Sequence, residues 1–286
     1  MKWNNLTNRL ATVYFWAIGI SIIAILAWFL YQILEPGLPH LSWKFITGMP
    51  QELTAGGGVG PHLFNSFYIL LLSMLFSLPI GIGAGIYLTI YAKKNKFTDL
   101  VRISVEALSS VPSIVFGLFG ALIFVNWMGW KFSILGGAAT LALLNLPILV
   151  RVTEESLSTV PSSYWSASLA LGSTRWQGIR RVLLPAAMPG LITGITLVAG
   201  RALGETAILI YTAGTSVSRF FPDFDPMAMG ETLAVHLWYV GGSSLAPDAK
   251  QIAQGSAALL VIVVLVFNLL IAIPSRILQK KLSGNK

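Results

Sequence analysis

Residues 151–189 read RVTEESLSTVPSSYWSASLALGSTRWQGIRRVLLPAAMP, a polar stretch between two strongly apolar segments. Arginine, glutamate, serine and threonine recur in it at helical spacing, and Pro161, Gly172 and Pro185 interrupt it. Proline ends or bends a helix, and glycine readily adopts the backbone conformation in which many helices end. The stretch therefore predicts short helices with exposed polar side chains, and we expect it to contact something other than lipid.

The composition of the chain is that of a membrane protein. Of its 286 residues, 55% are hydrophobic and only 10% are charged, and the mean hydropathy is +0.74. A soluble domain carries about 25% charged residues. Several apolar runs reach the length of about 18 residues that a membrane-spanning helix needs. The fold class that follows is an all-α integral membrane protein.

Six apolar runs predict six transmembrane helices. They cover residues 10–34, 63–92, 111–127, 133–150, 190–213 and 255–273. Residues 97–110 have the amphipathic pattern of a helix that lies near the membrane interface. We expect an N-terminal part with the first helix and an outer loop, a five-helix core that includes the polar stretch, and a basic tail. These parts cover residues 1–62, 63–275 and 276–286.

The basic residues indicate an orientation in the membrane. Of the 19 lysines and arginines, 14 are in the N-terminal segment, residues 93–110, residues 151–189 and the C-terminal tail, and 4 are in the opposite connections. Because cytoplasmic loops are enriched in these residues, we expect both termini and the polar stretch in the cytoplasm. The formal net charge of +8 does not indicate nucleic-acid binding, because the basic residues form no single patch.

The sequence gives little sign of a metal or nucleotide site. It has no cysteine, and His40, His62 and His236 are too scattered for ligand spacing, so we predict solvated or interfacial histidines. The Gly-x-Gly-x-Gly run at residues 81–85 follows no strand, and its outer glycines predict close helix packing instead of nucleotide binding. No stretch matches the phosphate-binding loop of an ATPase. We expect no cofactor and no catalysis by this chain.

Gly172 and its neighbours have the spacing of a known loop. Ser166, Ala167 and Ser168 precede it, and nine residues separate it from a Val-Leu-Leu-Pro sequence that begins at Val182. This pattern resembles the EAA loop of ABC-importer permeases, which reads Glu-Ala-Ala, three residues, Gly, nine residues and Ile-x-Leu-Pro. Here serine replaces the Glu and the second Ala, and valine replaces the Ile.

The same residues predict a knob of two helices joined by a turn. Trp165 and Leu169 form an apolar face of the first helix, Gly172 supplies a left-handed turn, and a second helix runs from Thr174 to near Pro185. The resemblance implies that an ATPase subunit binds this knob. The implied coupling residues are Tyr164, Trp165, Ser166, Ala167, Ser168, Leu169, Gly172 and Pro185. An ordinary amphipathic loop is the alternative.

Three further segments resemble one group of these permeases. They are PSIVFGLF (residues 112–119), NLPILVRVTEESLSTVP (145–161) and GRALGETA (200–207). They are similar to the permeases of the phosphate-specific importer, the Pst system, and their order is most similar to that of its A-type subunit. Ile208 stands where that group commonly has proline. The resemblance implies a type I ABC importer permease (MetI-like) bundle in a bacterial inner membrane.

The resemblance also implies partners and a cargo. The chain would form half of a translocation pathway with a homologous second permease subunit, within membrane lipid. Two ATP-binding subunits would hydrolyse ATP, and an extracytoplasmic phosphate-binding protein would deliver inorganic phosphate. One alternative is a permease for another oxyanion, such as sulfate or molybdate. Another is a channel or secondary carrier, although the sequence has no convincing internal repeat of the kind that carriers often show.

Arg201 and Glu205 are the main candidates for the substrate pathway. They are four residues apart near the middle of the fifth run, so we expect them on one face of one helix. A charge at the bilayer centre costs about 2.5–3.5 kcal/mol, so both are expected to face the bundle interior or a wet cavity. Arg201 would bind phosphate through its guanidinium, and Glu205 would hold it when the site is empty; alternatively, the two only neutralise each other. Asn145 and Arg151 are weaker candidates, and Arg151 also fits a cytoplasmic boundary.

Overall fold

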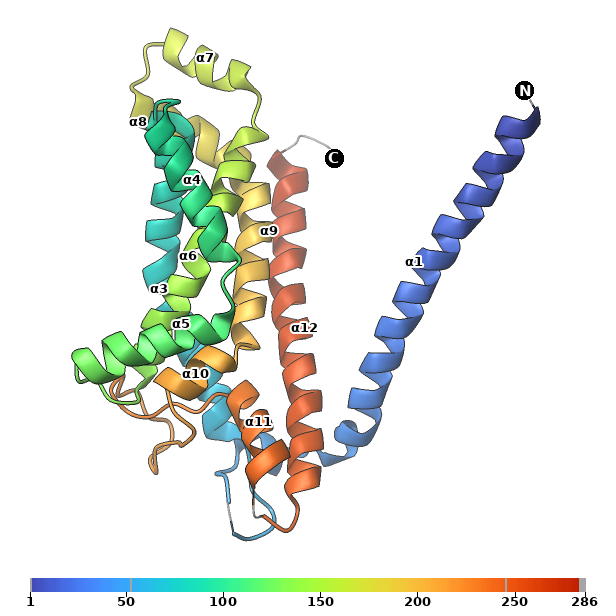
Figure 1. Ribbon diagram of the computed structural model, residues 1–286, viewed down its shortest axis with the longest axis vertical. Helices are drawn as coiled ribbons and strands as arrows, with labels where there is room; N and C mark the ends of the chain where they lie inside the picture. The colour runs from blue at the N-terminus through green and yellow to red at the C-terminus, as the bar shows by residue number, and fades with distance from the viewer. Residues whose placement is uncertain (1, 52, 245, 283–286) are drawn as a thin grey trace.

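The computed structural model describes residues 2–51, 53–244 and 246–282, and these form a bundle of helices with no β-strand (Figure 1). The long helices are α1 (Lys2–Gly37), α3 (Gly60–Ile86), α6 (Ile134–Ser158), α9 (Leu184–Leu203) and α12 (Ala249–Leu282). The shorter ones are α2 (Trp43–Thr47), α4 (Lys96–Ser109), α5 (Ser113–Gly120), α7 (Ser162–Ala170), α8 (Arg175–Gly178), α10 (Ala207–Thr212) and α11 (Leu233–Ser243). There is one 3₁₀ turn, η1 (Leu38–His40). There are also three π-helical turns, which are η2 (Tyr87–Tyr91), η3 (Ala121–Trp127) and η4 (Ile179–Leu183).

The prediction of six transmembrane helices is confirmed, with one of them bent. Among the described residues, five helices are long and apolar enough to cross a membrane, and a bent pair makes a sixth when it is counted as one span. The five cover residues 7–40, 60–91, 134–158, 175–203 and 249–273. The fourth predicted run was too short, because α6 continues past residue 150 for two further turns.

The bent pair consists of α4 and α5, and it differs from the predicted third helix. The two helices meet at 96°, and in Figure 1 α4 slants along α6 whereas α5 lies across the bundle. Pro112 causes the break, because a proline disfavours helical backbone in the residue before it, and Pro112 itself has an extended ψ of 139°. The amphipathic stretch at residues 97–110 is therefore a helix, as predicted, but it is one limb of this bent pair.

Helix α6 forms the centre of the bundle because glycines bring α3 very close to it. A Cβ atom on Gly81 would lie 2.6 Å from Cβ of Leu149, and one on Gly85 would lie 2.5 Å from Cβ of Thr153. A Cβ on Gly83, between them, would meet nothing within 4 Å. The prediction that the outer two glycines serve helix packing is confirmed.

A neighbouring face of α6 approaches α9 in the same way. A Cβ atom on Gly190 would lie 2.7 Å from Oγ of Ser156, and one on Gly194 would clash with the side chain of Val152. Since residues 152 and 156 are one helical turn apart, α6 uses one face for α3 and a neighbouring face for α9. The main apolar core lies along these contacts and includes buried Ile69, Leu141, Leu149, Val198 and Leu203.

Helix α1 stands apart from the bundle (Figure 1). Among the described residues, it packs near its C-terminal end against η1 and α12. A Cβ on Gly37 would lie 2.5 Å from Cβ of Ala258, and this close approach anchors α1 to α12. Large apolar side chains such as Phe15, Trp16 and Ile23 are 68–70% exposed, which suits a helix surrounded by lipid or by a partner.

The start of α1, the C-terminal end of α12 and the short helix α7 lie at one end of the molecule, and α11 lies at the other (Figure 1). This arrangement is the one that the predicted topology requires. The side of the membrane on which each end lies stays a prediction.

We predict that Gly85→Val destabilises the bundle and that Gly83→Val does not. Both changes add the same side chain to the same helix, but only the first enlarges a residue in contact with α6. Overpacking of this kind costs about 1–3 kcal/mol. Thermal unfolding of the detergent-purified protein should begin at a lower temperature for Gly85→Val than for Gly83→Val or wild type. Equal unfolding temperatures for the two variants would contradict the packing argument, and Gly85→Ala provides a milder test if Gly85→Val does not accumulate.

Candidate functional site

The knob predicted around Gly172 is present. Helix α7 ends before Gly172, whose φ of +80° is in the left-handed region, and a Cβ atom there would meet nothing within 4 Å. Glycine is therefore required by the backbone conformation and not by lack of space. Thr174 then caps α8 by a capping box, because its Oγ1 accepts from the Gln177 N–H at 3.3 Å and its own N–H donates to Oε1 of Gln177 at 2.9 Å.

The predicted coupling residues divide into an inner and an outer set. Trp165 and Ser168 face α8: a Cβ atom on Gly178 would lie 2.8 Å from Oγ of Ser168 and 2.9 Å from Cζ3 of Trp165. Ser168 is buried, and its hydroxyl donates to the carbonyl oxygen of Trp165 at 2.9 Å. These two side chains fix the position of α7. The exposed members of the set are Tyr164, Ser166, Ala167, Leu169, Gly172 and Pro185.

Two exposed apolar residues of the knob were missed in the sequence. Leu171 is 89% exposed and Trp176 is 56% exposed, next to Tyr164 at 52% and Leu169 at 38%. Leu171 could have been found from its position directly before Gly172, because a side chain at such a turn points outward. Single exposed apolar side chains are common, but four on one short knob form a surface suited to protein docking.

The second helix of the knob does not stop near Pro185, as predicted. The π-helical turn η4 joins α8 to α9, so that one helix runs over residues 175–203. Proline normally breaks a helix because it lacks an N–H and its ring collides with the preceding turn. Here the hydrogen-bond register changes in η4 immediately before Pro185, which then lies in the first turn of α9. The knob is therefore continuous with the helix that carries Arg201.

The predicted pairing of Arg201 with Glu205 is wrong. Helix α9 ends at Leu203, and Glu205 lies in a short non-helical segment before α10. The N–H of Gly204 donates to the Arg201 carbonyl at 3.1 Å, and this tight turn ends the helix. The two residues therefore do not share a helical face, and no ion pair joins them among the described residues. The alternative that they only neutralise each other loses its support.

Arg201 lies on an exposed face of α9. Gly190, Thr193 and Leu197 are exposed on the same helix at intervals of three or four residues, which places them on one stripe with Arg201. Between α6 and α9, the part of this stripe from Gly190 to Leu197 borders a cavity of about 520 Å³, which we call the α6–α9 groove and which is also lined by Glu155 and Ser156 on α6. Arg201 lies one helical turn beyond Leu197, past the residues that line this groove. Glu205 is half-buried.

Arg151 lies apart from Arg201, towards the α7 end of α6. Its Nε donates to Oε1 of Glu155 at 2.9 Å, and its Nη1 lies 3.5 Å from Oε1 of Glu106 on α4. These groups, together with Arg102 and Glu154, line a second cavity of about 380 Å³. Since Glu155 lines both cavities, Arg151 contacts the edge of the α6–α9 groove without entering it.

Asn145 lies in the core. It is fully buried in α6, and neither atom of its side-chain amide has a hydrogen-bond partner among the described residues. The structure thus does not bring Asn145 together with Arg151 or Arg201.

The prediction of solvated histidines is wrong for two of the three. His62 and His236 are 1% and 6% exposed and lie against Glu231, which is 4% exposed. Burial alone would raise the pKa of the Glu231 carboxyl, but the adjacent His236 and His62 outweigh it and lower that pKa. No local spacing could have revealed this group, because His62 and Glu231 are 169 positions apart.

Comparison with known sequences identifies relatives over the whole length. Residues 77–284 match the family described as binding-protein-dependent transport system inner membrane component. A probable ABC transporter permease protein of Bacillus subtilis, YqgI, is 45% identical over 98% of this chain and 99% of its own length. The phosphate transport system permease proteins PstA of Yersinia pestis and Haemophilus influenzae are 35% and 33% identical, over 94% and 93% of this chain and 90% and 93% of theirs.

Solved structures share the fold. A chain of a bacterial alginate ABC transporter, in complex with an alginate-bound periplasmic protein, superposes with a TM-score of 0.66 at 15% identity, over 93% of this chain and 96% of that one. A chain of the MetNI methionine ABC transporter in an inward-facing conformation gives 0.61 at 22% identity, over 76% and 94%. The family match, the relatives and the helical bundle agree, and this chain belongs to the inner membrane permeases of binding-protein-dependent ABC importers, the MetI-like family.

Proposed function

We propose that this chain is one of two permease subunits of an ATP-driven phosphate importer. The cargo is inferred from its similarity to the two PstA permeases over nine-tenths of its length and from the chemistry of Arg201. The chain hydrolyses no ATP itself. An ATP-binding subunit does so on the cytoplasmic side, and an extracytoplasmic binding protein supplies phosphate on the other.

The observation that carries this proposal is the exposed position of Arg201. A charged side chain that faces hydrocarbon is costly, so the exposed stripe of α9 is not a lipid-facing surface. A second permease subunit that covers this stripe would turn the α6–α9 groove into an enclosed path. Arg201 would then be the positive charge on the wall of that path.

A guanidinium suits this position because it presents a planar fork of N–H donors that matches two phosphate oxygens. In the described part of the chain, Arg201 has no carboxylate within ion-pair distance, so its donors remain open to an anion. Glu205, just beyond the end of α9, adds a negative charge near the path. Such a charge weakens anion binding and favours release, which conduction requires.

The same helix connects this charge to the docking surface. Because the helix over residues 175–203 begins in the knob and ends beyond Arg201, a displacement of the knob is passed to α9 without a flexible joint. ATP-driven closure of two ATP-binding subunits would move both knobs and rock the two permeases between inward-open and outward-open states, a rigid-body switch. The exposed Tyr164, Leu169 and Leu171 provide the contact.

We predict that Arg201→Gln lowers phosphate uptake by at least about tenfold. A hydrogen bond to a charged group contributes about 1.5–3 kcal/mol, and about 1.4 kcal/mol corresponds to a factor of ten. Uptake of radiolabelled phosphate should be measured in cells that depend on this chain, with Arg9→Gln as the control because Arg9 is an exposed arginine of α1, outside the bundle.

Unlabelled sulfate and molybdate should be added as competitors in the same assay. Phosphate transport predicts that neither reduces the uptake of labelled phosphate by the wild type. Normal uptake by an Arg201→Gln protein that reaches the membrane in normal amount would contradict the role of Arg201. If the protein takes up sulfate or molybdate instead of phosphate, that anion is the cargo and the proposal of phosphate is wrong.

We predict that Gly172→Val abolishes copurification of the ATP-binding subunit, whereas Gly129→Val preserves it. Gly129 has a φ of +69° and open space around it, like Gly172 at +80°, but it follows η3, outside the knob. A left-handed conformation costs a residue with a side chain about 1–2 kcal/mol, so both variants carry similar backbone strain. The measurement is the amount of ATP-binding subunit recovered per permease in mild detergent. Equal recovery with both variants would rule out a docking role for the Gly172 turn.

A further inference from the structure

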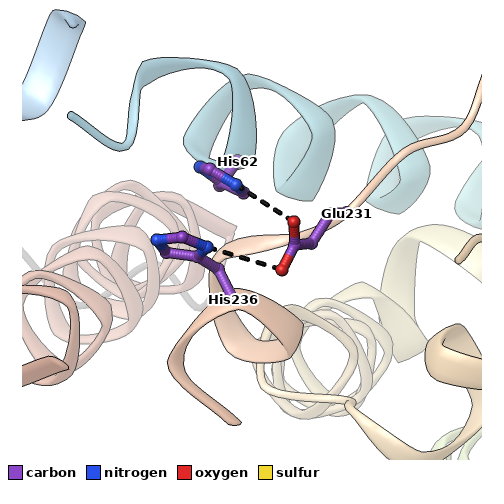
Figure 2. A group of neighbouring side chains, drawn as sticks. All are labelled: His62, Glu231 and His236. Atoms are coloured by element: carbon purple, nitrogen blue, oxygen red, sulfur yellow. Dashed lines mark hydrogen bonds and ion pairs between the residues drawn. The ribbon is translucent and has the colours of Figure 1, made fainter. Parts of the chain in front are cut away.

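Three residues far apart in the sequence meet at the end of the bundle opposite α7. His62 lies in the first turn of α3, Glu231 in the connection that precedes α11, and His236 in the first turn of α11. Nε2 of His62 lies 3.2 Å from Oε2 of Glu231, and Nδ1 of His236 lies 3.4 Å from Oε1 of the same carboxylate. Figure 2 shows that both rings direct one nitrogen towards the carboxylate. We call these three residues the His–Glu–His cluster.

The His–Glu–His cluster is buried but not satisfied by hydrogen bonds. Its members are 1–6% exposed. In the part of the chain that the structure describes, four of its atoms lack a hydrogen-bond partner: Nδ1 of His62, Oε1 of Glu231 and both ring nitrogens of His236. The contact of His236 with Oε1 is close enough for an ion pair but not aligned as a hydrogen bond. Buried polar atoms without partners are costly. A ligand that binds several of these atoms at once would remove that cost.

The rings of His62 and His236 are stacked, with centroids 3.7 Å apart and planes 26° apart. Two protonated imidazoles would repel each other at this separation in a buried site. Two neutral imidazoles and one carboxylate, by contrast, are a usual ligand set for a transition-metal ion, and catalytic zinc sites use this combination.

The distances within the cluster suit one small cation. One nitrogen or oxygen atom from each residue can be chosen so that all three lie within 4.8 Å of one another. Zinc binds imidazole nitrogen and carboxylate oxygen at about 2.0–2.2 Å, so neighbouring ligands around a tetrahedral ion lie about 3.3–3.5 Å apart. The two contacts of 3.2 and 3.4 Å are near this value. A cavity of about 310 Å³, lined by polar Ser216, Tyr239 and Ser244 among others, adjoins the cluster and gives room for water as a fourth ligand.

We propose that His62, Glu231 and His236 bind one divalent transition-metal ion, with Zn²⁺ as the best match. The ion joins the first turn of α3 to the connection before α11, and so closes the end of the bundle that is remote from the ATPase-docking knob. This connection already meets α3 through two hydrogen bonds, from Nδ2 of Asn65 to the Glu231 carbonyl at 3.2 Å and from the N–H of Leu233 to Oγ of Ser66 at 2.9 Å.

The test is metal binding by the full-length protein, purified in detergent, stripped with a chelator and titrated with Zn²⁺. We expect saturable binding of one Zn²⁺ per chain and a rise in unfolding temperature on binding, because an ion that binds only the folded state stabilises it. Co²⁺ in place of Zn²⁺ should give the visible absorption bands of a tetrahedral site. Each of His62→Gln, Glu231→Gln and His236→Gln should weaken binding by more than about 100-fold, since loss of a group that merely supports a ligand already costs about 10–100-fold.

The control is His40→Gln, which makes the same change at a half-buried histidine outside the cluster and should bind Zn²⁺ like the wild type. If a cluster variant does not fold, the wild-type stoichiometry and the Co²⁺ spectrum decide the matter alone. Wild-type protein that binds no metal, or cluster variants that bind it as tightly as the control, would overturn the proposal. In either case the cluster would only contribute the hydrogen bond between His62 and Glu231, which joins α3 to the connection before α11, and phosphate uptake would remain a separate question.

Discussion

The close approach of α6 to both of its neighbours is the constraint on which the bundle depends. Glycines at one-turn spacing on α3 and on α9 remove the side chains that would hold the helices apart, and α6 fills the gap with Leu149, Val152, Thr153 and Ser156. Without a hydrophobic force between helices in lipid, close van der Waals packing of this kind is the main source of association. Helices α3, α6 and α9 therefore behave as one unit. The packing of this unit determines where the charged residues on these helices lie.

This unit separates two kinds of surface. The face of α9 that carries Arg201 is open along its length, and the α6–α9 groove runs beside it. The charged groups near the α7 end, by contrast, are engaged with one another: Arg151 pairs with Glu155 and Glu106, so their charges are largely balanced within the chain. Among the described residues, Arg201 is in none of these ion pairs, so its charge, unlike that of Arg151, is not balanced by a carboxylate at contact distance.

The sequence predicted features that depend on local physics. Apolar run length predicted the spans, and Gly172 predicted the left-handed turn of the knob, because each follows from a few adjacent residues. The sequence did not predict features that depend on contacts between distant parts of the chain. The helical pattern continues through Glu205, but α9 ends at Leu203 and the chain starts a new helix at Ala207, α10, which packs against α5 and α6. The grouping of His62 with His236 requires α3 and α11 to be adjacent in space, and no spacing rule encodes this.

The π-helical turn η4 has a geometric consequence for the long helix over residues 175–203. A π turn is equivalent to one extra residue inserted into an α-helix, and one residue corresponds to about 100° of rotation at 3.6 residues per turn. The turn thus sets the phase between the two ends of the helix, which are the exposed α8 end and the exposed face of α9 that carries Arg201. In a regular α-helix of the same length, one of these ends would be rotated by about a quarter-turn relative to the other.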